Sequence, residues 1–98
     1  MTIEMKHVAD ETVLELTGRL DTRTAPVLDK TVNEDIPANV HLVLDLKGLE
    51  YISSAGLRVL LGAQKRLHKL GSMKLRNVSE EVMDIFEMTG FADILEIE

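Results

Sequence analysis

Two adjacent serines, Ser53 and Ser54, stand directly before Ala55, Gly56 and a run of leucines at helical spacing. We expect Ser53 to cap that helix, because a serine oxygen in this position accepts a hydrogen bond from an N–H group of the first turn. The Ser54 hydroxyl then stays free and faces solvent. A phosphate on Ser54 would meet the unpaired N–H groups and the positive end of the helix. A kinase that modified Ser54 would add a charge of roughly −1.5 to −2.

A structural interpretation of the serine pair stays open. Small neighbours leave room for another protein's active site, but a serine pair before a helix is ordinarily only a cap. The elements that position the pair must therefore be considered.

The first third of the chain predicts a hairpin and a helix. Alternating apolar residues indicate strands over Thr2–His7 and Thr12–Thr17. We expect Gly18 to end the second strand. A helix should begin at Thr24–Pro26, with a hydroxyl cap and a proline in its first turn, and end at Pro37.

The middle of the chain predicts a buried strand and an amphipathic helix. His41–Leu46 is nearly all apolar, which is typical of a strand in the centre of a sheet. Lys47–Ile52 is expected to be a loop that returns to the core. The following helix should end at Gly71, because glycine favours helix ends. Its predicted inward stripe consists of Leu57, Leu60, Leu61, Gln64, Leu67 and Leu70.

The last third predicts a short strand over Met73–Arg76 and a helix that Ser79 caps and Thr89–Gly90 ends. Ile94–Ile97 is expected to add an edge strand. The order ββαβαβα(β) predicts an α/β domain with a mixed, mostly parallel sheet, an N-terminal hairpin and helices packed on it.

Parallel strands that end at Thr17, Leu46 and Arg76 would finish at one edge of the sheet, where open α/β sheets place their sites. Three loops should gather there: Gly18–Arg23, Lys47–Ser54 and Asn77–Ser79. The serine pair belongs to the second of them.

Composition limits the class of protein. The 98 residues should form one domain (1–98), with no cysteine and a net charge of −6. An acidic balance argues against nucleic-acid binding, and no segment is predicted to insert into a membrane or act as a signal peptide, so we expect a cytoplasmic protein. The histidines His7, His41 and His68 lack ligand spacing, and no nucleophile has an evident base. We therefore expect no enzyme, no metal site and no cofactor.

Three stretches stand in a fixed order along the chain. Gly18-Arg19-Leu20-Asp21 follows the second strand, Leu42–Leu46 precedes Tyr51-Ile52-Ser53-Ser54-Ala55-Gly56-Leu57, and Met88–Leu95 lies near the C-terminus. Together they resemble the STAS domain of bacterial anti-sigma factor antagonists. The first is similar to that family's Gly-x-Leu/Ile-Asp signature and the last to its Thr-Gly-Leu-x-x-x-Phe pattern.

The resemblance implies a function. Such antagonists bind an anti-sigma factor that is also an ATP-dependent serine kinase, and so free a sigma factor. Phosphorylation of a serine in an Asp-Ser-x-Gly stretch ends the binding, and a PP2C-type phosphatase reverses it. In that register the phosphoacceptor is Ser54. Ser53, which stands where the family usually has aspartate, is the second choice. Some members instead use the residue directly before the glycine, but here that residue is Ala55, which cannot accept phosphate.

The same resemblance implies where the anti-sigma factor binds. The expected contacts are Asp21, Thr22, Arg23, Ser53, Ala55, Gly56 and Arg58. Arg58 lies four residues after Ser54, hence on the same helical face, where it could pair with a phosphate or an acidic partner. Solvated surface roles for Asp21 and Arg58 stay open, and no residue pattern indicates an oligomeric state.

Two other functions are considered. Lone STAS domains also resemble accessory subunits of lipid-transport ABC systems, in which the same helix end docks on an ATPase without phosphorylation. A receiver-like domain would use Asp45 as phosphoacceptor, but the first strand ends without the acidic pair that its Mg²⁺ requires. We therefore interpret Asp45 as a loop-shaping residue.

Overall fold

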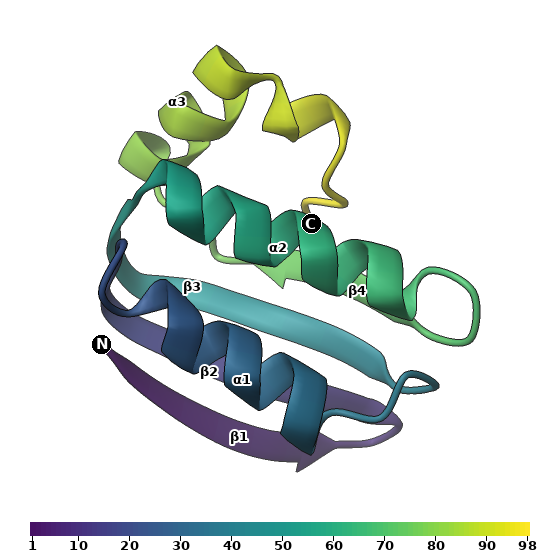
Figure 1. The fold of residues 1–98 in the computed structure, drawn as a ribbon. Coiled ribbons are helices and arrows are strands. Elements are labelled where there is room, and N and C mark those ends of the chain that lie inside the picture. The colour runs from purple at the N-terminus through teal and green to yellow at the C-terminus, as the bar shows by residue number, and fades with distance from the viewer.

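The computed structural model describes all 98 residues, with four strands in one sheet. The strands follow each other in space in the order β1 (Thr2–Val8), β2 (Glu11–Leu20), β3 (His41–Ile52) and β4 (Ser72–Arg76). β1 and β2 form an antiparallel hairpin, whereas β2, β3 and β4 run parallel (Figure 1). The predicted mixed sheet is thus confirmed. The expected shared edge holds only for β2 and β3, which end together at Leu20 and Ile52. β4 ends level with Asp45, seven residues before the end of β3, so the Asn77–Ser79 turn does not join the other two loops.

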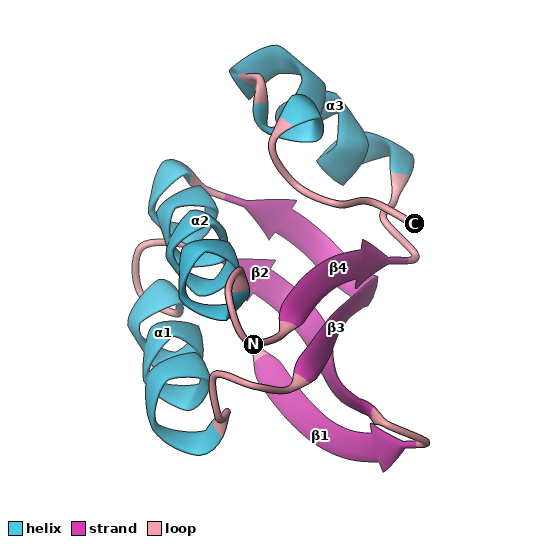
Figure 2. Cartoon of the chain, turned by 90° about the vertical axis from the view of Figure 1, so that its right-hand side faces the viewer, coloured by secondary structure: helices cyan, strands magenta, loops and turns pink.

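Three helices connect or follow these strands. α1 (Ala25–Asp35) and α2 (Ser54–Leu67) lie side by side on one face of the sheet, and α3 (Glu80–Thr89) stands apart from them (Figure 2). A 3₁₀ turn, Phe91–Asp93, follows α3. None of these helices is long and apolar enough to cross a membrane.

One aliphatic core joins the layers. It comprises 21 buried residues, among them Leu14, Leu44 and Leu75 from the sheet, Leu60 from α2 and Phe86 from α3. β3 is an inner strand and is buried on both faces, because Val43, which points away from this cluster, is also inaccessible. The expectation of a central, doubly covered strand is confirmed.

The two inner strands are longer than predicted. Gly18 does not end β2, which continues to Leu20, and Lys47–Ile52 is the second half of β3 rather than a loop. The β2–β3 register shifts twice, between Glu15 and Thr17 and between Gly18 and Arg19. Gly18 has a φ of +101° at the second shift, a conformation that glycine adopts readily.

Two further expectations were wrong. Leu70 is 71% exposed, because α2 ends at Leu67 and the Gly71 amide closes the final turn on the Leu67 carbonyl at 2.9 Å. Ile94–Ile97 forms no edge strand. The 3₁₀ turn occupies the approach to it, and only a single parallel bridge joins Ile97 to Leu75.

Candidate functional site

The serine pair lies at the start of α2, as the sequence predicts. Ser53 is the extended residue before the helix, and its Oγ accepts from the Gly56 N–H at 3.3 Å. Ser54 is the first helical residue, is exposed, and makes no side-chain hydrogen bond. The N–H groups of Ser54 and Ala55 also have no acceptor in the protein. A free hydroxyl therefore stands beside two free donors at the positive end of a helix.

Gly56 explains why this helix start is held so close to the sheet. A Cβ built on Gly56 would lie 2.7 Å from Cγ of Leu20 and 2.9 Å from Cγ1 of Ile52. Only a hydrogen side chain fits there, since real Cβ contacts are longer. Gly56 is buried beneath the surface that carries Ser54, and Ala55 is half-buried against the core.

The loop after β2 is built around Asp21. Its Oδ1 accepts from the backbone N–H groups of Arg23 at 3.0 Å and Thr24 at 3.1 Å. These donors, the Thr24 N–H first among them, hold the pKa of the Asp21 carboxyl below its ordinary value. The predicted hydroxyl cap at Thr24 is wrong. Its Oγ1 donates to the Arg19 carbonyl at 2.7 Å, and the Ala25 amide is satisfied by the Asp21 carbonyl.

The sheet brings the Asp21 loop and the serine pair together. Leu20 and Ile52 are register partners on β2 and β3, and the Ser53 amide donates to the Leu20 carbonyl at 2.8 Å. The next residues on the two strands, Asp21 and Ser53, therefore leave the same edge side by side. Thr22 and Arg23 are exposed on the loop.

Arg58, four residues after Ser54 on α2, is also exposed. With Thr22 and Arg23 it is one of the predicted partner-contact residues that are exposed, whereas Gly56 is buried.

A second pair at this edge was not predicted. The Arg19 guanidinium lies over the Tyr51 ring, 4.3 Å from its centre, and Tyr51 is 37% exposed. The two residues are register partners on β2 and β3. Both fall in stretches that the sequence assigned to loops, so the cross-strand contact was not anticipated. The sequence has no short-range signal for this contact, because it depends on the register of β2 against β3.

An open depression of about 490 Å³ lies beside this pair. It is lined by Met1, Gly18, Arg19, Asp21, Arg23, Thr24 and Glu50. Its charged side chains have both signs, so the depression has no single ionic preference.

No group of three or more metal-ligating side chains comes together in the protein. The Asp45 carboxylate is used structurally: its Oδ1 accepts from the Lys47 N–H and from Asn77 Nδ2, each at 3.1 Å. Asn77 has a φ of +58° in the turn after β4. Asp45 thus ties that turn to β3, in agreement with the loop-shaping interpretation.

Known proteins share this sequence pattern and fold. An anti-sigma-B factor antagonist of Bacillus subtilis (strain 168) is 32% identical over 98 residues, which cover 99% of this chain and 90% of the relative. An anti-sigma F factor antagonist of Paenibacillus polymyxa is 33% identical over 100 residues, which cover 99% of this chain and 86% of the relative. The crystal structure of an anti-sigma factor antagonist from Mycobacterium paratuberculosis superposes with a TM-score of 0.88 at 22% sequence identity. The superposition covers 98% of this chain and 83% of that one.

The family model of the STAS domain matches residues 2–98. Since it spans the hairpin, the serine pair at the start of α2 and the C-terminal segment, this chain belongs to the STAS domain family.

Proposed function

We propose that this protein is an anti-sigma factor antagonist. It binds an anti-sigma factor that has serine-kinase activity, and phosphorylation of Ser54 by that kinase ends the binding. A PP2C-type phosphatase restores the binding form. The observation that carries the proposal is the exposed, unpaired Ser54 hydroxyl in the first turn of α2, beside the Asp21 loop. Relatives that are about one-third identical carry the name of anti-sigma factor antagonists.

A phosphate on Ser54 is compatible with the fold. The free N–H groups of Ser54 and Ala55 are donors for its oxygens, and the helix end favours negative charge by about 0.3–1 kcal/mol. Arg58, one helical turn away, supplies a cation on the same face. Modification therefore changes the surface and leaves the fold in place.

The same phosphate disfavours a partner that fits the neutral hydroxyl. About 2.7 kcal/mol is enough to change an affinity 100-fold. Removing a phosphate of roughly −1.5 to −2 charges from water at an interface without new cations costs several kcal/mol. The charge alone is sufficient to end the binding.

Ser53 is a poorer acceptor than Ser54. It is half-buried, and its Oγ already accepts from the Gly56 N–H. Phosphorylation there would replace the cap that starts the helix. The two serines thus have different roles: Ser53 caps α2, and Ser54 is the proposed phosphoacceptor.

The acceptor is tested by incubating the protein with its partner kinase and ATP, and measuring intact mass. We expect one phosphate on the unmodified protein and on S53A, and none on S54A. S79A is the matched control, because Ser79 caps α3 in the way that Ser53 caps α2. Phosphate retained by S54A but lost from S53A would contradict the assignment.

Binding is tested with S54D and S54A against the anti-sigma factor by calorimetry. We expect S54A to bind like the unmodified protein and S54D to bind about 100-fold more weakly. Unchanged binding by S54D would contradict the phosphorylation switch. A complex with an ABC-transporter ATPase in place of any anti-sigma factor would show instead that the protein is a transport accessory subunit.

A further inference from the structure

Ser54 is the first member of a straight row of side chains along α2. The row, which we call the α2 stripe, consists of Ser54, Arg58, Leu61, Lys65 and His68. Their spacings of four, three, four and three residues keep them within an arc of about 80°, because each residue turns the helix by roughly 100°. Four of the five are exposed, and Leu61 is half-exposed in the middle of the row. The stripe therefore continues the candidate site along the whole helix.

The helix segment that contains the stripe is basic on an acidic protein. Residues 54–70 contain Arg58, Lys65, Arg66 and Lys69 and no acidic residue, whereas the rest of the chain has 17 acidic and 7 basic side chains. None of the four makes an ion pair, whereas four of the seven basic residues elsewhere do: Lys6, Arg19, Lys74 and Arg76. Arg66 instead donates to the Val32 carbonyl of α1 at 3.2 Å. The other three are free to meet an acidic partner.

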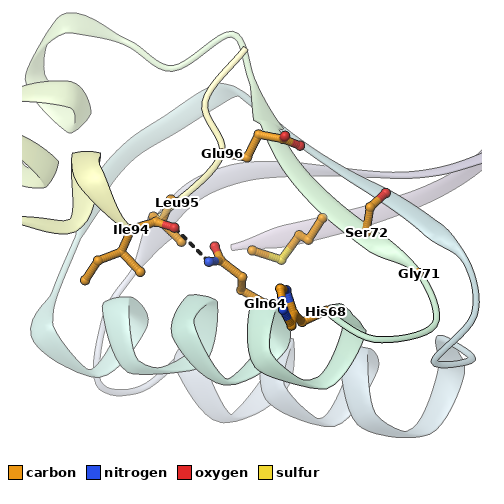
Figure 3. Close-up of a pocket in the computed structure, with 8 residues that line it drawn as sticks. Gln64, His68, Gly71, Ser72, Ile94, Leu95 and Glu96 are labelled. Atoms are coloured by element: carbon orange, nitrogen blue, oxygen red, sulfur yellow. Dashed lines mark hydrogen bonds between the residues drawn. The ribbon is translucent and has the colours of Figure 1, made fainter.

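An apolar notch lies beside the C-terminal half of the stripe. It has a volume of about 260 Å³ and is lined by Leu61, Gln64, Lys65, His68 and Ile94. Gln64 Nε2 donates to the Ile94 carbonyl at 2.7 Å, which holds the segment after the 3₁₀ turn against α2 (Figure 3). The Ile94 side chain stays 47% exposed at the edge of the notch.

Gln64 leaves one polar atom unpaired in the same place. Its Oε1 is buried and has no hydrogen-bond partner in the protein. Because Nε2 is committed to Ile94, the amide cannot reverse without facing one oxygen against another. Because this oxygen is buried, it is closed to a partner, and the notch offers only its two apolar side chains, Leu61 and Ile94.

We propose that an acidic helix of the anti-sigma factor lies along the α2 stripe, which rests on the proposed function above. Its carboxylates pair with Arg58 and Lys65, and one apolar side chain enters the notch between Leu61 and Ile94. The pairing rests on charge complementarity between this basic helix and an acidic one. The notch, at about 260 Å³, takes one apolar side chain, which favours a protein partner over a membrane surface.

This arrangement also explains why a phosphate on Ser54 would act so strongly. The phosphate would stand on the same face as Arg58, four residues away, and so oppose the same row of carboxylates. It repels the acidic helix directly and pairs with the Arg58 guanidinium that the helix needs. One modification therefore changes two contacts.

The proposal is tested by measuring association rates and affinities for the purified anti-sigma factor at low and at high ionic strength. We expect K65E to associate roughly tenfold more slowly at low ionic strength, with a weaker salt dependence. K30E is the matched control, because Lys30 is an exposed lysine of α1 that also makes no ion pair. It should bind within about twofold of the unmodified protein.

The notch is tested in the same assay with I94A. We expect an affinity loss of about fivefold, since a partly buried anchor contributes on the order of 1 kcal/mol. V27A is its control, because Val27 on α1 is similarly exposed, at 54% against 47% for Ile94. Circular dichroism melts of all four variants establish that each is folded.

The outcomes separate the two proposals. No binding by the unmodified protein would overturn both. If S54D abolishes binding while K65E and K30E bind equally well, only the proposal for the α2 stripe is overturned. The acidic-helix proposal would likewise be overturned if K65E weakened binding to vesicles of anionic lipid but left the affinity for the anti-sigma factor unchanged.

Discussion

Gly56 of α2 rests directly on Leu20 at the end of β2: a Cβ on Gly56 would lie 2.7 Å from the Leu20 Cγ and 3.0 Å from its carbonyl oxygen. The same Leu20 carbonyl accepts from the Ser53 amide. Leu20 thus sets both how closely the start of α2 approaches the sheet and which residue of β2 it lies beside. The position of Ser54 relative to the Asp21 loop follows from this contact.

We predict that G56A destabilises the protein by about 1–3 kcal/mol, because the added methyl group has no room against Leu20 and Ile52. G62A is the control on the same helix. A Cβ at Gly62 meets nothing within 4 Å, so alanine should stabilise by about 0.5–1 kcal/mol. Urea unfolding measures both changes. Equal effects of the two variants would show that the contact at Leu20 is easily relieved.

The two serines should differ in their effect on folding. S53A removes the oxygen that accepts from the Gly56 N–H, and should cost about 1 kcal/mol of unfolding free energy. S54A removes no hydrogen bond and should stay within about 0.5 kcal/mol of the unmodified protein. Thermal and urea unfolding of both variants check this. A loss for S54A as large as for S53A would mean that Ser54 also supports the helix start.

Asp21 should make stability depend on pH in the acid range. Its pKa is lowered in the folded protein from an ordinary value of 3.8, chiefly by the Thr24 N–H. Its contribution is therefore complete above that value and is lost as the pH falls through the lower, folded pKa. D21N should be less stable at neutral pH and lose less stability on acidification. D84N, at an exposed position of α3, is the control. Parallel pH profiles for D21N and the unmodified protein would contradict the assignment.

The Arg19–Tyr51 pair should be energetically coupled. A guanidinium 4.3 Å from the centre of an exposed ring gains about 0.5–1 kcal/mol. A double-mutant cycle of R19A and Y51A on unfolding free energy measures that coupling. Strict additivity of the two changes would show that the stacking contributes nothing to stability.

Much of the fold could be predicted from local patterns. The hairpin, the central strand from His41, the start of α2 at the serine pair and the end of α3 at Gly90 all have short-range signals. The second half of β3 has none. Its buried residues Leu46, Leu49 and Ile52 are three residues apart, because the register with β2 shifts, and a spacing of three does not identify a strand.

The site was predicted only in part for the same reason. Ser53 and Ser54 lie in a helix start, which a sequence reveals. Arg19 meets Tyr51, and Gly56 meets Leu20, through strand pairing and packing between distant segments. Such contacts depend on the register of β2 against β3, and two register shifts separate it from the simple pairing that alternation would suggest.

The uneven charge along the chain has a consequence before any contact forms. Residues 54–70 contain four basic side chains and no acidic one, while the remainder is strongly negative, so α2 is a positive element of a negative molecule. In the field of an acidic protein it would rotate during diffusion, so that α2 arrives first. A phosphate on Ser54 would reduce the positive charge of α2. The modification would then reduce the fraction of collisions that arrive in a productive orientation, as well as the lifetime of the complex.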